Sequence, residues 1–293
     1  MGYRVDNAVI MAAGTSSRFA PLSFERPKAL IKVKGEILIE RQIRQLKEAG
    51  INQIIVVTGY KSEQFTYLEE KFGVILVENK EYLTRNNNGS IYAVRDYLAN
   101  TYICSADNYF TRNPFEAEVE EAYYSALYAD GETKEWCLKE DEEGYITSVE
   151  IGGRDAWYML GHVFWSREFS ERFKNILEEI YEKEETKDLL WESIYMQYLD
   201  QLKMKVRHYD NDFIFEFDTL DELREFDASY RKNSGSQILA AVAESLGCRE
   251  EEIYDMKSFK YPDSTEAAGF RFCYADRYYE YGYDRKTLVE IKL

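Results

Sequence analysis

The chain has 293 residues, enough for one large α/β domain with an appendage or for two modest domains. Its 37 basic and 54 acidic residues give a formal net charge of −17. So acidic a chain is a poor general binder of nucleic acid or of anionic membranes. We therefore expect any phosphate group to be bound by a few local cations and backbone amides.

Cysteine and histidine usage excludes further classes. The four cysteines form no C-x-x-C pair, and with only two histidines in the chain a zinc site is not expected. Scattered thiols suit a reducing compartment. The apolar run near the N-terminus is too short for a signal sequence, and no stretch reaches the length of a membrane span. We expect a cytoplasmic protein.

The first hundred residues alternate between buried strands and amphipathic helices. Short apolar runs that end in turn residues predict strands, and apolar residues at helical spacing predict the helices between them. This alternation predicts an α/β fold with a doubly wound, mostly parallel, Rossmann-like sheet. The predicted strands are residues 8–12, 53–58, 74–77 and 102–105, and the predicted helices are residues 37–49, 62–72 and 90–98.

The pattern changes after residue 108. Strands at 123–128, 135–138 and 145–151 predict an inserted hairpin region, and the rest alternates again. The polar, turn-rich residues 231–236 predict a border between a domain at 1–232 and a small α+β appendage at 237–293. Later elements are helices at 169–185, 189–202, 220–230 and 237–246, strands at 205–209 and 214–217, a helical turn at 250–252 and a hairpin at 269–284.

The strongest motif is a turn of small and hydroxyl residues directly after the first strand. Such a turn lets backbone amides approach and cradle an anion. Arg18 and, after a proline, Lys28 add two cations on the following loop. The turn is neither a Walker loop nor a Rossmann G-x-G-x-x-G, so taken alone an ordinary βα-turn explains it equally well. The candidate nucleotide-binding residues here are Ala12, Ala13, Gly14, Thr15 and Ser16.

Three carboxylates are candidate ligands of Mg²⁺, which prefers oxygen ligands and commonly accompanies bound phosphates. Asp107 follows the strand predicted at 102–105, where open α/β sheets place ligand-binding groups. Glu216 and Asp218 flank Phe217, and strand alternation would put both on one face. Each acid alone is more often a cap, a turn residue or a solvated surface residue.

Aromatic side chains are abundant, with 25 Tyr and 4 Trp. Aromatic faces with a nearby carboxylate bind quaternary ammonium groups through cation–π attraction, although a tryptophan is more often part of the core. In the polar turn before the helix predicted at 90–98, asparagines pair with a base edge or cap the helix. The candidate acceptor-binding residues are Trp136, Tyr158, Trp165, Trp191 and Glu192, and the candidate base-binding residues are Asn87, Asn88 and Ser90.

Together these motifs resemble those of the nucleotidyltransferase superfamily over residues 6–230. In that superfamily an A-G-x-G-[ST]-R turn holds the NTP phosphates, its arginine lies on the pyrophosphate side, and a Pro-Lys pair contacts the α-phosphate region. The matching residues are Gly14, Arg18 and Lys28, with Ser16 in place of the second glycine. An Asp after the fourth strand, here Asp107, and a late acid hold the metal. Ala106, directly before Asp107, is a further candidate nucleotide-binding residue.

Within the superfamily, the late E-x-D motif and three aromatic motifs resemble those of the bacterial choline-phosphate cytidylyltransferases. The aromatic motifs are Glu135-Trp136, the G-x-x-F-W segment ending at Trp165, and the triplet ending at Glu192. The triplet departs from the pattern, because Leu190 replaces Tyr and Glu192 replaces Asp.

This resemblance implies Mg²⁺-dependent, in-line transfer of CMP from CTP to phosphocholine, giving CDP-choline and pyrophosphate without a covalent intermediate. Two alternatives remain: the same chemistry on 2-aminoethylphosphonate or a sugar 1-phosphate, and a catalytically silent nucleotide-binding module. The aromatic bias disfavours a sugar site, and retention of Lys28, Asp107 and Asp218 disfavours the silent module. The tail resembles the N-terminal hairpin of choline kinase-like proteins, which implies a structural or homo-oligomer-forming appendage.

Overall fold

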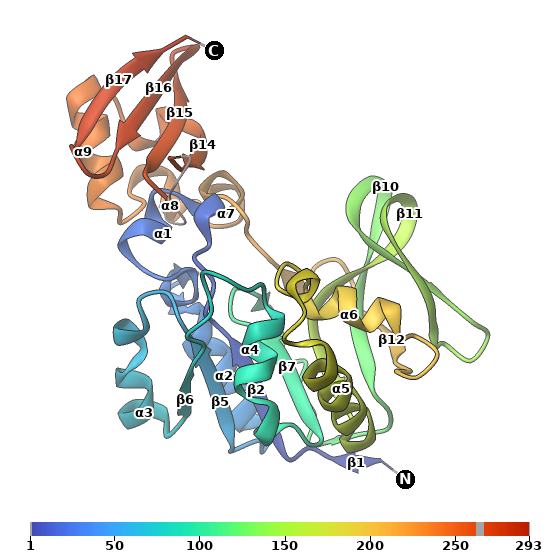
Figure 1. The fold of residues 1–293 in the computed structure, drawn as a ribbon. Coiled ribbons are helices and arrows are strands. Elements are labelled where there is room, and N and C mark those ends of the chain that lie inside the picture. Colours follow the sequence, from blue (N-terminus) through green and yellow to red (C-terminus); the bar gives the residue numbers. More distant parts are fainter. Residues whose placement is uncertain (1, 262–266, 293) are drawn as a thin grey trace. The chain divides into compact units, whose positions relative to one another are not determined.

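The computed structural model describes residues 2–261 and 267–292 (Figure 1). The chain forms two compact units, each built from two segments of the sequence. Unit 1 comprises Met1–Gly14 and Leu38–Glu216, and unit 2 comprises Thr15–Ile37 and Phe217–Leu293. The division therefore falls within the predicted phosphate turn and within the late E-x-D motif.

The border predicted between residues 232 and 237 falls inside unit 2. The Arg224 side chain donates to the backbone carbonyls of Ile253 at 2.6 Å and Glu250 at 2.7 Å, and the Ser234 N–H donates to the Glu250 carboxylate at 2.7 Å. These buried bonds join the two sides of the predicted border. Residues 262–266 and 293 of the predicted appendage lie outside the described residues.

Unit 1 is built on a seven-stranded sheet in the order β12-β10-β11-β7-β2-β5-β6. The neighbours β7, β2, β5 and β6 are all parallel, which confirms the predicted doubly wound sheet. Continuous apolar sequence produces this arrangement, because parallel strands are buried on both faces. These strands are β2 (Asn7–Met11), β5 (Ile54–Thr58), β6 (Ile75–Glu78) and β7 (Thr101–Ser105), and β12 is Lys205–His208.

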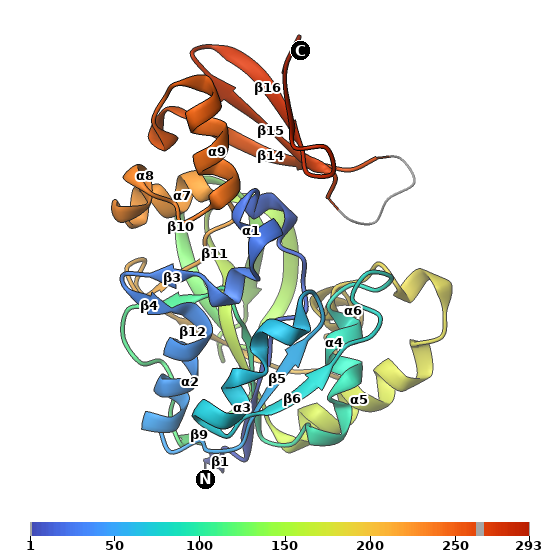
Figure 2. The same cartoon turned by 90° about the vertical axis from the view of Figure 1, so that its left-hand side faces the viewer.

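Helices cover both faces of this sheet, with α2 on one side and α4 and α5 on the other (Figure 2). Val9, Ile55 and Ile103 share one face and join the core cluster that contains Phe169 and Phe173 of α5. The helices of unit 1 are α2 (Leu38–Glu48), η3 (Ser62–Phe65), α3 (Tyr67–Phe72), α4 (Asn88–Ala93), η4 (Arg95–Tyr97), α5 (Arg167–Ile180), η5 (Glu184–Thr186) and α6 (Trp191–Gln197).

The inserted region is a single long hairpin of β10 (Tyr123–Glu140) and β11 (Ile146–Trp165), drawn in green in Figure 1. The two strands predicted at 123–128 and 135–138 are therefore one, and the strand predicted at 145–151 continues to Trp165. Several register shifts interrupt the pairing. Such bulges break the two-residue alternation by which a strand is recognised in a sequence. Short strands complete the unit: β1 (Tyr3–Arg4), β8 (Tyr109–Phe110), β9 (Glu118–Val119) and β13 (Ile214–Phe215).

Unit 2 contains a four-stranded antiparallel sheet in the order β14-β15-β16-β17, with α9 beside it in both views (Figures 1 and 2). The hairpin predicted at 269–284 is confirmed as β15 and β16. Phe270 and Phe272 are buried on the same face of β15, so this face of the sheet packs against the core of unit 2. The strands are β14 (Tyr254–Phe259), β15 (Gly269–Tyr274), β16 (Arg277–Gly282) and β17 (Thr287–Ile291).

The remaining elements of unit 2 are short, apart from α9. None of the helices in residues 2–261 and 267–292 is long and apolar enough to cross a bilayer. These elements are η1 (Ser17–Phe19), α1 (Leu22–Glu25), η2 (Lys28–Leu30), β3 (Lys32–Val33), β4 (Glu36–Ile37), α7 (Leu220–Phe226), α8 (Ser229–Lys232), α9 (Gln237–Leu246) and η6 (Glu250–Glu252).

Candidate active site

The first half of the phosphate turn is fixed at the carboxyl ends of three parallel strands. The Ala12 N–H donates to the Val57 carbonyl at 2.8 Å, and the Ala106 N–H donates to the Met11 carbonyl at 3.1 Å. Ala13 accepts a bond from the Tyr60 N–H at 3.0 Å. Open α/β sheets bind ligands at this edge, so the predicted turn stands where the fold favours a nucleotide.

The second half of the turn belongs to unit 2 and contains a strained residue. Ser16 has φ 47° and ψ 44°, a left-handed conformation that favours glycine. This is the position at which the superfamily pattern has its second glycine. The Ser16 carbonyl accepts from the Phe19 N–H at 2.9 Å and so begins η1. The serine therefore retains the backbone geometry that the glycine would supply.

The two predicted phosphate cations of unit 2 differ in environment. Arg18 is exposed, and its Nη1 lies 2.6 Å from Asp218 Oδ2. Lys28 begins η2 and is buried, with Nζ 5.7 Å from the centre of the Phe19 ring. Burial of the Lys28 stem fixes its position, whereas Arg18 has the conformational freedom of a surface side chain.

The predicted metal ligands of unit 1 lie on adjoining segments. Asp107 follows β7, and the side chain of its neighbour Asn108 donates to Glu216 Oε2 at 3.4 Å. Pairing of β13 with β8 brings Glu216 beside this turn. Gln42 fixes the turn by donating to the carbonyls of Ser105 and Asn108, both at 2.8 Å.

One expectation about these acids is wrong. The strand predicted at 214–217 ends at Phe215, so Glu216 and Asp218 do not share a strand face. Instead they flank the buried Phe217 in the segment that leads into α7.

The donor set fits Mg²⁺ only together with a ligand. Among the described residues, no group of three or more His, Cys, Asp or Glu side chains is arranged to hold a metal. Mg²⁺ commonly takes one or two carboxylates and completes its shell with substrate phosphates and water. Asp107 and Glu216 offer such hard oxygen donors, while Asp218 accepts from Arg18. The residues present therefore suit an ion that arrives with the nucleotide.

A cavity of about 230 Å³ in unit 1 contains two of the predicted acceptor residues, Trp136 and Glu192. Tyr124 and Glu135 also line the cavity, but neither was predicted from the sequence to bind the acceptor. Glu135 could have been predicted, because it belongs to the E-W motif. Among the residues that the structure describes, the lining of the cavity includes three glutamates and neither lysine nor arginine. The lining residues are Ser105, Asn108, Tyr124, Glu135, Trp136, Met159, Leu160, Gly161, Leu190, Glu192 and Glu216.

Two other predicted acceptor residues are core residues, which corrects the expectation that they contact the acceptor. Trp165 is 0% exposed and Trp191 is 1% exposed, with their ring centres 5.1 Å apart. Trp191 also stacks on Tyr124, which does line the cavity. Tyr158 is partly buried, pairs with Cys137 across the hairpin, and is not among the residues that line the cavity. Trp191 therefore supports the cavity wall from behind.

Glu192 has unusual electrostatics for a glutamate. Burial raises its pKa from 4.5 to about 7, although hydrogen bonds from Asn87 and Tyr124 act in the opposite direction. The Asn87 Nδ2 donates to Glu192 Oε2 at 3.0 Å, and the Tyr124 hydroxyl donates to Oε1 at 3.5 Å. A cation in the cavity would favour the ionised carboxylate.

The three residues expected to bind the base are hydrogen-bonded to protein groups. Asn87 Oδ1 accepts from the Trp191 N–H at 2.7 Å. Asn88 is fully buried and donates to the Thr186 carbonyl at 2.9 Å and to that of Leu189. Ser90 Oγ accepts from Asn79 Nδ2 at 3.2 Å. The alternative of a side-chain helix cap is not realised at Asn87, which makes no cap bond to α4.

Comparison with known proteins agrees with this geometry. Residues 8–178 match the MobA-like NTP transferase domain. A choline-phosphate cytidylyltransferase of Streptococcus pneumoniae is 34% identical over 75% of this chain and 96% of its own length. A 2-aminoethylphosphonate cytidylyltransferase of Lancefieldella rimae is 36% identical over 76% of this chain and 93% of its own.

A solved structure of the CTP:phosphocholine cytidylyltransferase from Streptococcus pneumoniae aligns with a TM-score of 0.74 and 35% identity. The alignment covers 78% of this chain and 99% of that one. The parallel sheet is thus that of a known enzyme family. The chain is a nucleotidyltransferase and belongs to the MobA-like NTP transferase family.

Proposed function

We propose that the protein transfers CMP from CTP to a phosphorylated acceptor with a cationic ammonium head, and that the acceptor is phosphocholine. The observation that carries this proposal is the cavity lined by Trp136, Glu135 and Glu192, without a lysine or arginine among its lining residues. An aromatic face beside carboxylates attracts a cation and repels a second anionic group. The relatives named for choline-phosphate and 2-aminoethylphosphonate support the same substrate class.

The reaction is an in-line displacement. A phosphate oxygen of the acceptor attacks the α-phosphorus of CTP, the bond to the β-phosphate oxygen breaks, and pyrophosphate leaves with the electron pair. Positioning and charge neutralisation carry such reactions, so the protein needs no nucleophile. Bound Mg²⁺, for which Asp107, Glu216 and Asp218 are the proposed ligands, would supply neutralisation of the phosphate charge.

The other residues bind and orient. In this proposal the amides of the turn from Ala12 to Ser16 hold phosphate oxygens, Arg18 compensates charge on the departing pyrophosphate, and Lys28 compensates charge at the α-phosphate. Glu135 and Glu192 hold the ammonium head, with Trp136 against its methyl groups. The base contacts assigned to Asn87, Asn88 and Ser90 are not part of the proposal, because these side chains are engaged with protein groups.

A second candidate acceptor, 2-aminoethylphosphonate, is favoured by one feature of the cavity. Its three carboxylates could accept hydrogen bonds from a primary ammonium, which a trimethylammonium group cannot donate. Trp136 is the one tryptophan that lines the cavity, and this indole face favours the methylated head. The two acceptors therefore differ in which part of the cavity they use.

Pyrophosphate release tests the reaction class. Purified protein with phosphocholine and Mg²⁺ should release pyrophosphate from CTP and form CDP-choline, and EDTA should abolish both. Lys28→Met, which keeps most of the apolar stem, should lose activity by about 10²–10³, the usual effect of losing one stabilising contact in the transition state. Equal activity of this variant and the wild type would remove Lys28 from the mechanism.

A further inference from the structure

The Asn87 side chain uses both of its polar atoms on one short segment more than 100 residues away in sequence. Its Oδ1 accepts from the Trp191 N–H at 2.7 Å, and its Nδ2 donates to Glu192 Oε2 at 3.0 Å. Trp191 is the first residue of α6, and Glu192 lines the acceptor cavity. One amide thus holds both the start of a helix and the carboxylate that this helix presents.

The neighbouring residues hold the same two segments together. The Asn86 N–H donates to the Lys187 carbonyl at 2.8 Å, and Asn86 Nδ2 donates to the Asp188 carbonyl at 3.1 Å. Asn88 donates to the carbonyls of Thr186 and Leu189. Three consecutive asparagines therefore bind residues 186–192, and Asn87 alone among them reaches the cavity carboxylate.

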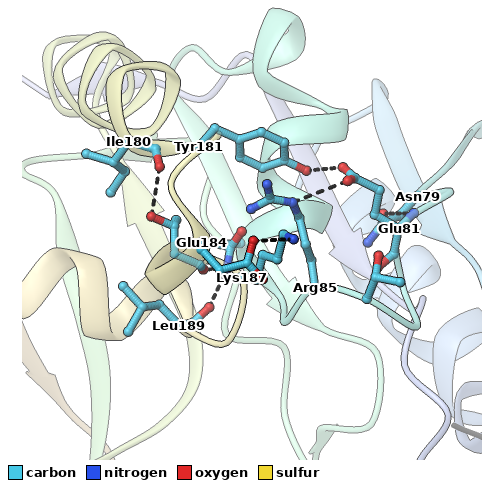
Figure 3. A network of polar contacts seen from close by, with 11 residues as sticks. Asn79, Glu81, Arg85, Ile180, Tyr181, Glu184, Lys187 and Leu189 are labelled. Carbon is cyan, nitrogen blue, oxygen red and sulfur yellow. Dashed lines mark hydrogen bonds and ion pairs between the residues drawn. The ribbon is translucent and has the colours of Figure 1, made fainter.

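A polar network anchors this loop at its other end. Figure 3 shows Tyr181 and Arg85 converging on the Glu81 carboxylate: the Tyr181 hydroxyl donates to one oxygen and Arg85 Nε donates to the other at 3.3 Å. The Arg85 guanidinium also lies over the Tyr181 ring at 3.8 Å. These contacts hold the loop at Glu81 and Arg85, a few residues before Asn87. Asn87 is therefore held both by this network and by its own bonds to α6.

We propose that Asn87 is a positioning residue for the acceptor: it fixes Glu192 in the cavity by bonds to the Glu192 carboxylate and to the Trp191 N–H, and so sets affinity for the cationic head. This inference rests on the proposed function. The Glu192 side chain has three rotatable bonds, so without a partner its carboxylate would spread over several rotamers. A site held by a supporting hydrogen bond binds more tightly, because less ordering is required on binding.

The Asn87 amide also stabilises the negative charge of the Glu192 carboxylate. Glu192 shares its cavity with Glu135 and Glu216 and faces the Tyr124 hydroxyl. In this acidic surrounding the Nδ2–H of Asn87 is a donor that favours the ionised carboxylate. A carboxylate at position 87 would keep the acceptor atom for the Trp191 N–H but replace that donor by a like charge.

Asn87→Asp is therefore the discriminating variant, and Asn86→Asp is its matched control. The control makes the same chemical change one residue away, on an exposed side chain bonded to a backbone carbonyl. At pH 8 we expect Asn87→Asp to raise KM for phosphocholine, and the dissociation constant of choline, at least about tenfold, since like charges in one site disfavour each other strongly. KM for CTP should stay within about twofold. Asn86→Asp loses one bond to a backbone carbonyl of the same segment but adds no charge beside Glu192, so its effect on KM for phosphocholine should be clearly smaller than that of Asn87→Asp.

The Glu192→Gln background completes the test. With a neutral partner, Asn87→Asp should cause little further loss, so the two changes should be strongly non-additive. Loss of CTP affinity, an equal effect of Asn86→Asp, or full additivity with Glu192→Gln would overturn the positioning role. Failure of the wild type to bind any cationic acceptor would instead refute the proposed function, which choline binding to the wild type measures directly.

Discussion

Arg18 Nη1 lies 2.6 Å from Asp218 Oδ2, so the cation expected at the NTP phosphates and an acid expected at the metal ion are bonded to each other. The two residues are 200 positions apart in sequence and belong to the same compact unit. Their side chains are 74% and 36% exposed. An ion pair this exposed contributes little to stability, so the two groups remain available to a bound nucleotide.

Removal of either partner should therefore separate stability from activity. We expect Arg18→Ala and Asp218→Ala to lower the free energy of unfolding by less than about 1 kcal/mol. Each should lower kcat/KM by about 10²–10³, as losing one transition-state contact does. Urea denaturation and initial rates measure the two effects. Rates within threefold of the wild type would show that the pair has a structural role only.

The phosphate turn should gain stability from the glycine that the family pattern has at position 16. In Ser16→Gly the left-handed conformation no longer costs the roughly 1–2 kcal/mol that a side chain adds there, while greater freedom of the unfolded chain offsets about 0.5–1 kcal/mol. The net expectation is a gain of up to about 1 kcal/mol in urea denaturation. Thr15→Gly, at a residue without positive φ, should destabilise instead. Equal destabilisation by both changes would contradict the strain at Ser16.

The sequence predicts the parallel sheet well because its strands are continuous apolar runs. Residues 53–58 were expected as a strand, and β5 covers Ile54–Thr58 with every residue buried. The division into units was not predictable in this way. Thr15–Ile37 joins the C-terminal segment through contacts between distant parts of the chain, and local composition carries no record of such contacts.

The sequence indicates which kinds of residue the candidate site contains, but not which of their side chains face the cavity. Gly161 has φ 104°, and the pairing of β10 with β11 shifts register around it, so alternation along β11 breaks between Met159 and Val163. Counting residues could not then tell which aromatic side chains face the cavity. Trp136 does line it, whereas Trp165 packs in the core.

Glu192 should cost stability in exchange for cation binding. Its pKa is about 7 in the folded protein against 4.5 unfolded, so the folded state loses stability as pH rises from 4.5 to 7 and bears the full cost above pH 7. Each pKa unit corresponds to about 1.36 kcal/mol, and partial exposure reduces the total to roughly 1–3 kcal/mol.

We therefore expect Glu192→Gln to be more stable than the wild type at pH 8 by that amount, roughly 1–3 kcal/mol, and nearly equal at pH 4.5. Urea denaturation at the two pH values measures this, and the low-pH comparison serves as the internal control. A constant difference between the two proteins at both pH values would contradict the raised pKa. Choline affinity should fall in the same variant.

Trp136 should determine the preference for a methylated head. Cation–π attraction in a desolvated site contributes about 2 kcal/mol, so Trp136→Ala should lose most of the selectivity for phosphocholine over phosphoethanolamine while KM for CTP changes little. Tyr128→Ala is a matched control, because Tyr128 is an exposed aromatic residue on the same strand and outside the cavity lining. Undiminished selectivity in Trp136→Ala would remove the indole from the acceptor site.

The most direct test of the account is kcat/KM of the wild type for phosphocholine, phosphoethanolamine, 2-aminoethylphosphonate and glucose 1-phosphate, with CTP and Mg²⁺. Cation–π attraction between the methylated head and the Trp136 ring in a desolvated site contributes about 2 kcal/mol, so phosphocholine should exceed phosphoethanolamine at least tenfold. The sugar phosphate, which has no cation for the acidic cavity, should be inactive. Faster turnover of either primary amine would assign the cavity to that acceptor, and turnover of the sugar phosphate alone would contradict the proposed function.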